Sequence, residues 1–335
     1  MAEDVKDPRD VPWHPRRRHV LYGHEAAEAR LLKACQSGKL HHAWLISGQR
    51  GIGKATLAYR FARYLAQPPG EQDFSSLAVS ADSQTAHLLG AGAHPNIFVL
   101  ERALDTKNKR LKTEIAVDDA RQAIDFMNRT SATGGWRIVI VDPVDELNAS
   151  SSNALLKMIE EPPERAIILM VCHQPGSLLR TIRSRSIRLP LQPLSFDNTL
   201  KVIGEVREGA GDAGMAAEMS HGSPGRALEL LESKGAAAFA DFKSRVKLSA
   251  AACAELGSRF GGRDSAADYA IFCDLLIGWV AERARDAGLA GQGAPLARAH
   301  DDVVYSIRQA DALNLDRRQT VVDALLRVDE ALKAS

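Results

Sequence analysis

LISGQRGIGKATLAYRFARYL, residues 45–65, is the stretch that decides the fold of this chain. An apolar run ends at Gly48, and the segment Gly48–Lys54 matches the phosphate-loop pattern G-x-x-x-x-G-K. Apolar residues at helical spacing follow the turn, namely Leu57, Ala58, Phe61, Ala62 and Leu65. A strand, a glycine turn and a helix form the context in which that pattern binds phosphate. The sequence therefore predicts an α/β domain built around a phosphate loop.

The candidate phosphate-binding residues lie in this turn and at the start of the helix after it. Glycines allow the backbone amides to turn toward a phosphate, the helix N-terminus adds positive potential, and Lys54 can reach the outer phosphates of a nucleotide. A glycine turn that binds nothing is the competing interpretation, and the matching strand and helix on either side argue against it. The predicted cofactor-binding residues here are Gly48, Gly51, Ile52, Gly53, Lys54, Ala55 and Thr56.

The residue after the lysine departs from the phosphate-loop pattern. A serine or threonine ordinarily stands there and holds Mg²⁺ through its hydroxyl. This chain has Ala55 at that position, and Thr56 lies one residue too late. We therefore expect ATP or ADP to bind weakly or without hydrolysis, and the sequence leaves the binding of Mg²⁺ open.

Composition bounds the class of protein. A length of 335 residues is enough for two or three domains, and 45% hydrophobic with 25% charged residues is ordinary for a globular protein. A net charge of +1 argues against a free-standing DNA-binding protein. We expect no membrane span and no signal peptide, because the chain has no apolar run of about eighteen residues and starts with polar ones. Four scattered cysteines without disulfide-like spacing indicate the reducing cytoplasm.

Strands and helices alternate on both sides of the phosphate loop. Near the N-terminus, the basic run Arg16–His19 is more readily a solvated arm than a contact to nucleic acid. A helix over residues 24–36 precedes the loop, and residues 67–96 form an excursion rich in Ser, Ala and Gly. Residues 96–101 (NIFVLE) predict a second strand, and residues 117–127 a helix. This alternation predicts a parallel sheet flanked by helices.

A third buried strand ends at a carboxylate. The apolar run Ile138–Val141 is followed by Asp142, at the place where a phosphate-loop ATPase has the carboxylate that orders Mg²⁺. A glutamate that activates the attacking water would normally come next, but this chain has Pro143. Asp145 and Glu146 lie nearby and are each displaced by two or more positions from that role.

The segment that follows carries a resemblance to a known family. NALLKMIEEPP, residues 153–163, resembles the N-A-L-L-K-x-[LI]-E-E-P-P segment of bacterial clamp-loader subunits, AAA+ proteins that load the sliding clamp for the replicative DNA polymerase. TIRSRS, residues 181–186, resembles the Ser-Arg-Cys motif of that family, with Ser186 in place of Cys. GSPGRAL, residues 222–228, resembles the start of its second sensor helix. The resemblance covers about residues 11–232.

The positions at which the chain differs from the family's motifs indicate which type of clamp-loader subunit it resembles. A hydrolysing motor subunit should keep a hydroxyl after Lys54, a glutamate after Asp142 and a Thr-rich sensor, where this chain has Cys172-His173. Losing those groups should lower the rate of phosphoryl transfer by orders of magnitude. The combination resembles the delta-prime type, the non-motor member of the loader ring. That resemblance assigns Arg185 a catalytic role in trans, as an arginine finger, and places Arg226 and Asp142 with the cofactor-binding residues.

The resemblance also implies an organisation, partners and cofactors. We expect an AAA+ phosphate-loop domain over residues 1–192, a helical lid over 193–235 and a helical collar over 236–335. Expected partners are gamma/tau motor subunits and a delta-type subunit, with the sliding clamp and primed DNA reached through the assembly, the DNA polymerase III holoenzyme. Members of the family often carry a cysteine-ligated zinc module, but residues 67–96 contain no cysteine, so we expect no zinc. Independent ATPase activity is not expected.

Three alternatives stay open at this point. An arginine near a helix end often only pairs with a carboxylate or with the helix dipole, which is the plain interpretation of Arg185 and Arg226. The chain could be an active ATPase of the gamma/tau type if Thr56 or water replaced the missing Mg²⁺ ligand and Asp145 or Glu146 replaced the missing glutamate. It could also be an unrelated phosphate-loop kinase, an interpretation that the Glu-Glu-Pro-Pro segment and the spacing of residues 181–186 argue against.

Overall fold

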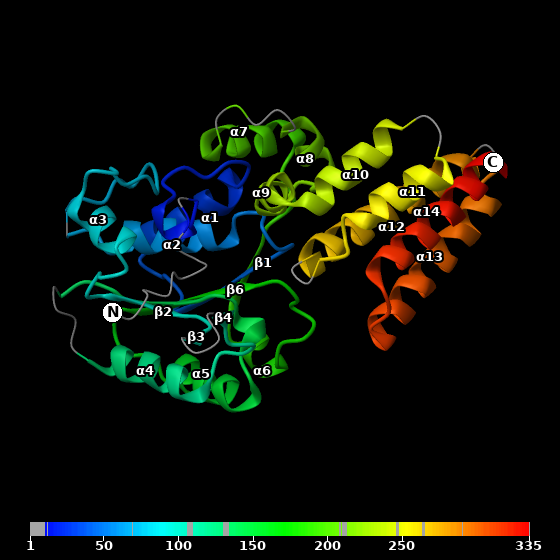
Figure 1. Ribbon diagram of the computed structural model, residues 1–335. Coiled ribbons are helices and arrows are strands. Elements are labelled where there is room, and N and C mark those ends of the chain that lie inside the picture. The colour runs from blue at the N-terminus through cyan, green and yellow to red at the C-terminus, as the bar shows by residue number, and fades with distance from the viewer. Residues whose placement is uncertain are drawn as a thin grey trace, which may run out of the picture. The chain divides into compact units, whose positions relative to one another are not determined.

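The computed structural model describes residues 11, 13–68, 70–105, 110–129, 134–207, 209, 213–245, 248–262, 265–289 and 291–334 (Figure 1). Contacts divide the chain into two compact units, Met1–Arg226 and Ala227–Ser335. This boundary falls within helix α9 (Pro224–Glu232). The three-part division at residues 192 and 235 stays a prediction.

A five-stranded sheet forms the centre of the first unit. Its order is β2-β5-β6-β1-β7, and every pairing in it is parallel. The strands are β1 (Ala43–Ser47), β2 (Ile97–Leu100), β5 (Arg137–Val141), β6 (Ala166–Cys172) and β7 (Ile187–Pro190). All residues of β1 and β6 are buried, as expected for strands covered on both faces. The predicted α/β fold with a parallel sheet is confirmed.

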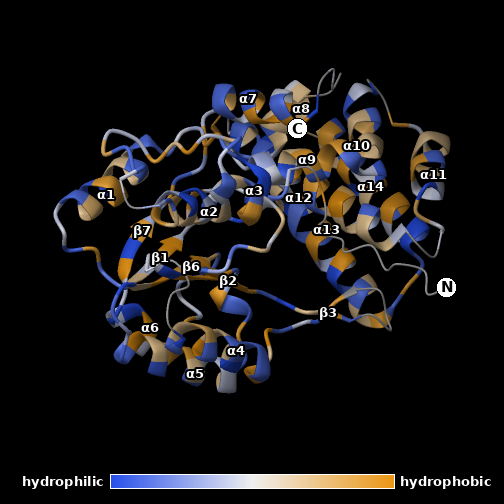
Figure 2. Cartoon of the chain, turned by 90° about the vertical axis from the view of Figure 1, so that its left-hand side faces the viewer, coloured by the Kyte–Doolittle hydropathy of each residue, from blue (hydrophilic) through white to orange (hydrophobic). Residues whose placement is uncertain are grey.

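Helices cover both faces of this sheet (Figure 1). On one face lie α1 (Glu25–Gln36), α2 (Lys54–Leu65) and α3 (Gln84–Gly90), and on the other lie α4 (Val117–Asn128), α5 (Ala149–Glu160) and α6 (Arg180–Ser184). Helices α4 and α5 show polar and apolar residues side by side in Figure 2, since one side of each faces the sheet and the other faces solvent. A short antiparallel pair, β3 (Leu104–Asp105) and β4 (Arg110–Leu111), stands apart from the sheet.

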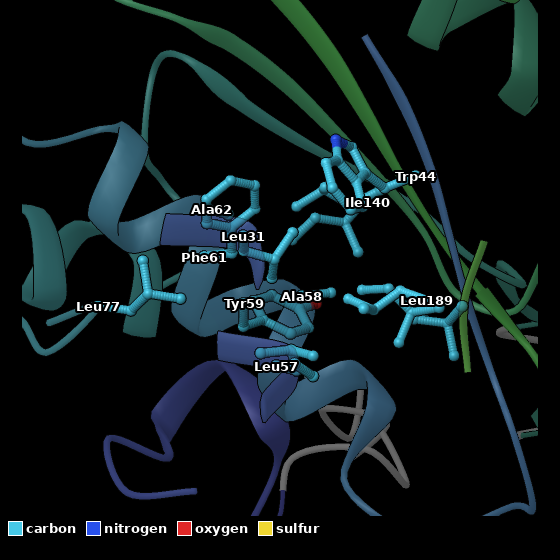
Figure 3. Packing of buried hydrophobic residues seen from close by; sticks show 14 of the residues in the cluster. Leu31, Trp44, Leu57, Ala58, Tyr59, Phe61, Ala62, Leu77, Ile140 and Leu189 are labelled. Atoms are coloured by element: carbon cyan, nitrogen blue, oxygen red, sulfur yellow. The ribbon is translucent and has the colours of Figure 1, made fainter. Parts of the chain in front are cut away.

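The core under α2 holds the phosphate-loop helix against the sheet. Leu57, Ala58, Phe61, Ala62 and Leu65 of α2 are all buried, as the helical spacing predicts. They share a cluster with residues of α1 and of the strands, including Leu31, Trp44, Ile140 and Leu189 (Figure 3). The start of α2, and therefore the loop that precedes it, is fixed by this packing.

The N-terminal segment packs against α2, so the predicted solvated arm is wrong for Arg16, Arg18 and His19, which are all partly buried. Arg63 of α2 is 1% exposed, and its guanidinium donates to the carbonyl oxygens of Arg18 at 3.2 Å and Arg16 at 3.0 Å. The side chain of Arg18 pairs with Glu205 of α7 (Phe196–Val206), while Arg17 remains exposed. A buried guanidinium needs hydrogen-bond acceptors, and the main chain of this segment supplies them.

The remainder of the chain is helical. Helices α7, α8 (Ala213–Met219) and the start of α9 complete the first unit. The second unit contains α10 (Lys234–Ser244), α11 (Ala250–Ser258), α12 (Ala266–Leu289), α13 (Ala294–Leu313) and α14 (Arg317–Ala334). Within it, Phe272 of α12 lies 6.3 Å from Phe239 and 5.0 Å from Phe260 between ring centroids. The predicted all-helical C-terminal region is confirmed. No helix in the described residues is both long enough and apolar enough to cross a membrane.

Candidate nucleotide-binding site and arginine finger

The phosphate loop joins the end of β1 to the start of α2. Gly51 and Gly53 have φ values of +79° and +103°, a region that L side chains rarely adopt, so the loop requires glycine at both positions. Gly53 directly precedes Lys54, the first residue of α2. The loop therefore ends at the N-terminus of α2, and the apolar residues of α2 are buried in the core. This is the arrangement expected of a phosphate site.

Lys54 turns back onto its own loop. Its side chain is 3% exposed, and Nζ donates to the carbonyl oxygens of Gly48 and Gln49, each at 2.6 Å. Burial lowers the pKa of Lys54 to about 8, and the nearby carboxylates of Asp142 and Asp145 oppose that shift. Because the ammonium already lies inside the loop, its chemistry and that of the loop amides fit a nucleotide phosphate.

Asp142 stands at the end of β5, where the sequence places it. Burial raises its pKa to about 7, the neighbouring carboxylate of Glu101 adds to the rise, and Lys54 opposes it. Lys54 and Asp142 are thus close enough to influence each other. The donor set for Mg²⁺ nevertheless lacks a hydroxyl, because Ala55 occupies the position after the lysine. These residues fit a phosphate better than a complete magnesium site.

Asp145 and Glu146, the acidic residues near the position of the missing glutamate, each contact another residue of the chain. Asp145 Oδ1 accepts a hydrogen bond from the backbone N–H of His173 at 2.8 Å, which ties the segment after β5 to the end of β6. Glu146 pairs with Arg102, with Nε and Oε2 2.7 Å apart. Each carboxylate therefore already has a partner in this structure, and whether either one takes the role of the missing glutamate stays a prediction.

Cys172 ends β6 and His173 follows it, at the place where the family resemblance expects a sensor. Burial raises the pKa of the Cys172 thiol to about 12 and lowers the pKa of His173 to about 4, with Lys54 and Arg50 adding to the second shift. Both side chains are neutral at pH 7. Cys172 is fully buried, and the role of the two side chains at the site stays a prediction.

The start of α9 closes over the tip of the loop. Ser223 Oγ donates to the carbonyl oxygen of Arg50 at 2.8 Å, and the backbone N–H of Gly225 donates to that of Gly51 at 2.9 Å. A Cβ added to Gly51 would lie 3.1 Å from the backbone nitrogen of Arg226. The backbone of Arg226 therefore lies at the loop, and the predicted contact of its side chain with a nucleotide stays a prediction.

The structure adds three residues to this site. Ser223 and Gly225 hold the loop from outside, and His24 Nε2 lies 2.7 Å from the carbonyl oxygen of Ile52. His24 is buried directly before α1. Ser223 and Gly225 belong to the segment GSPGRAL that resembles a family motif. Nothing in the residue types of Ser223, Gly225 or His24 indicates that they contact the phosphate loop.

Arg185 lies apart from the phosphate loop of its own chain. It caps the C-terminus of α6, on the sheet face opposite α2 (Figure 1). Its side chain is 42% exposed, and Nη2 lies 2.9 Å from Oε1 of Glu160, at the end of α5. The pairing with a carboxylate that was one interpretation of Arg185 is therefore present, and the guanidinium is also accessible to a neighbouring molecule.

The described residues contain no group of three or more His, Cys, Asp or Glu side chains placed to hold a metal ion. The expectation that no zinc binds stays a prediction. The same is true of the expected nucleotide.

Comparison with known proteins places residues 23–195 in the family described as DNA polymerase III, delta subunit. The chain is 36% identical over 148 residues to DNA polymerase III subunit delta' of Pseudomonas aeruginosa, covering 44% of this chain and 42% of that protein. It is 31% identical over 206 residues to subunit delta' of Escherichia coli K12, covering 61% and 58% respectively. The matched part thus spans between two fifths and three fifths of these relatives.

A tau/gamma subunit and one solved structure are less similar. Subunit tau/gamma of Haemophilus influenzae is 29% identical over 182 residues, covering 54% of this chain and 25% of that protein. A gamma subunit-related protein of Thermotoga maritima aligns with 90% of this chain and 99% of its own at 18% identity and a TM-score of 0.46.

Proposed function

The chain belongs to the DNA polymerase III delta-subunit family, and on this premise we propose that it is a delta-prime-type subunit of a clamp loader. In this role it acts as a stator in a ring with gamma/tau-type motor subunits and a delta-type subunit. Arg185 is offered as an arginine finger to the ATP of a neighbouring motor subunit. The assembly then loads a sliding clamp on primed DNA at the expense of that ATP, in the cytoplasm.

The observation that supports this proposal is the contrast between the incomplete nucleotide site and the exposed Arg185. The phosphate loop keeps Lys54 but has Ala55 where a hydroxyl is ordinarily found, and the segment after β5 keeps Asp142 but has Pro143 in place of a glutamate. Arg185, in contrast, is exposed and lies on the other face of the sheet. A guanidinium that acts on the nucleotide of a neighbour needs no catalysis in its own loop.

The chain's own loop is proposed to hold ATP or ADP weakly and without turnover. A nucleotide supplies phosphate oxygens as hydrogen-bond acceptors, and Lys54 with the loop amides of Gly51 and Gly53 would bind them. Arg226 lies at the same loop through the start of α9. The positions that ordinarily complete the magnesium site and orient a water molecule carry Ala55 and Pro143, which have no hydroxyl and no carboxylate.

The deciding experiment is the ATPase activity of a reconstituted loader with clamp and primed DNA. Arg185→Ala is expected to lower turnover by ~10-fold or more while the ring still assembles, because arginine fingers contribute strongly to phosphoryl transfer. Arg180→Ala is the matched control, since Arg180 is an exposed arginine of the same helix. Unchanged turnover in Arg185→Ala would reduce the chain to a scaffold.

An active ATPase of the gamma/tau type is the second candidate, favoured by the mutual influence of Lys54 and Asp142. It requires ATP turnover by the isolated chain. Turnover above background that Lys54→Ala abolishes would support this candidate over the stator.

A further inference from the structure

Glu160 is the last residue of α5 and lies beside Arg185, the proposed arginine finger. Its Oε1 is 2.9 Å from Nη2 of Arg185, and the two side chains are 45% and 42% exposed. Arg185 Nη1 also approaches the carbonyl oxygen of Thr181 at 3.4 Å. The finger is therefore accessible and at the same time held from one side.

The backbones that carry the two side chains are fixed by a common core. Ile159, next to Glu160 at the end of α5, and Ile182 of α6 are buried in the same cluster. The turn after α6 is closed by its own hydroxyl groups, because Ser184 Oγ donates to the carbonyl oxygen of Thr181 and Ser186 Oγ to that of Ile182. The separation of Glu160 and Arg185 is thus set by packing and not by the side chains alone.

We propose that Glu160 is a positioning residue for Arg185, a role that rests on the proposed function of the finger. A guanidinium has five N–H donors. The contacts to Glu160 and Thr181 each use one N–H, on Nη2 and Nη1 respectively, so the other N–H donors remain for a phosphate of the neighbouring subunit. By restricting the rotamers of a long side chain, Glu160 lowers the entropy that Arg185 loses when it engages that phosphate.

The expected effect is moderate, because the pair is exposed to solvent. Exposed ion pairs contribute little, so loss of Glu160 should lower the rate by about two- to fivefold and not abolish it. Glu161 offers a matched control. It is the next residue along the chain, it is also exposed, and it caps α5 through its backbone.

The test uses the reconstituted loader with clamp and primed DNA and measures kcat and KM for ATP. Glu160→Ala is expected to lower kcat by about two- to fivefold with KM unchanged, and Glu160→Gln by about twofold or less, since an amide keeps the acceptor but not the charge. Glu161→Ala is expected to leave both constants unchanged. Gel filtration of the assembled ring checks that no variant acts by failing to assemble.

A double-mutant cycle separates positioning from a general structural effect. If Glu160 acts only through the finger, Glu160→Ala adds nothing in the Arg185→Ala background. A loss that persists in that background overturns the role of Glu160, and so does a normal kcat in Glu160→Ala when Arg185→Ala is impaired. If Arg185→Ala itself turns over ATP normally, the proposed function fails, and the role of Glu160 fails with it.

Discussion

Gly225 of α9 lies directly against Gly51 of the phosphate loop. Its backbone N–H donates to the Gly51 carbonyl at 2.9 Å, and a Cβ added to Gly225 would lie 2.8 Å from the Gly51 Cα. Two glycines thus allow two backbones to approach more closely than any side chain permits. The start of the second sensor segment and the phosphate loop consequently form one packed structure.

Replacing Gly225 by alanine should separate these two segments. The added methyl group has only backbone to displace, so we expect the free energy of unfolding to fall by about 1–3 kcal/mol. Thermal and urea unfolding of the isolated chain measure the effect. Gly204→Ala is the control, because Gly204 lies within α7 and an added Cβ meets nothing within 4 Å. Equal stability of Gly225→Ala and Gly204→Ala would contradict the close approach.

The raised pKa of Asp142 predicts a specific pH dependence of stability. Its folded-state pKa of about 7 lies above the ordinary value of 3.8, so the folded chain binds more protons between these values. Stability should therefore fall as pH rises through that range. Asp142→Asn removes the ionisation, and we expect it to be more stable than wild type by on the order of 1–3 kcal/mol at pH 8, with the difference shrinking toward pH 4.

Urea unfolding at a series of pH values tests this expectation. Asp118→Asn serves as the control, since Asp118 has an 80% exposed side chain on α4. Lys54 changes stability in the opposite direction and at higher pH. Its pKa is lowered to about 8 from 10.5, so stability should rise with pH between these two values. A difference between Asp142→Asn and wild type that does not change with pH would exclude Asp142 as the titrating group.

Arg63 is expected to hold the N-terminal segment in place. Its guanidinium is buried and donates to the carbonyls of Arg16 and Arg18, so Arg63→Ala leaves those acceptors without a donor and opens space beside α2. We expect a loss of about 2–4 kcal/mol in the free energy of unfolding and faster tryptic cleavage after the arginines of residues 16–18. Arg121→Ala, at an exposed position of α4, should change neither. Undiminished protection of residues 16–18 would show that other contacts hold the segment.

The sequence predicts those parts of the site that are formed by residues close together in the chain. The phosphate loop, the buried face of α2 and the position of Asp142 after β5 follow from local pattern, because strand, turn and helix each leave a periodic or glycine signature. The separation of Arg185 from that loop also agrees with the expectation of a finger used in trans.

The contacts between distant segments could not be predicted in the same way. The approach of Gly225 to Gly51, the docking of Arg16 and Arg18 on Arg63 and the pairing of Glu160 with Arg185 each join residues that are far apart in the sequence. Their residue types fit many exposed positions equally well. An arginine run in particular has the composition of a solvated arm, and only the buried guanidinium of Arg63 shows why this one is packed.

Ala55 offers a direct test of what the phosphate loop lacks. Ala55→Thr restores a hydroxyl at the position that ordinarily holds Mg²⁺, so we expect nucleotide affinity to become Mg²⁺-dependent and to rise by about tenfold. Calorimetric titration of ATP with and without Mg²⁺ measures this, with Thr56→Ser as the control because it leaves the first position unchanged. Turnover should stay at background, since Pro143 still provides no carboxylate to orient water. ATP hydrolysis by Ala55→Thr alone would mean that Asp145 or Glu146 can leave its present partner and take that role.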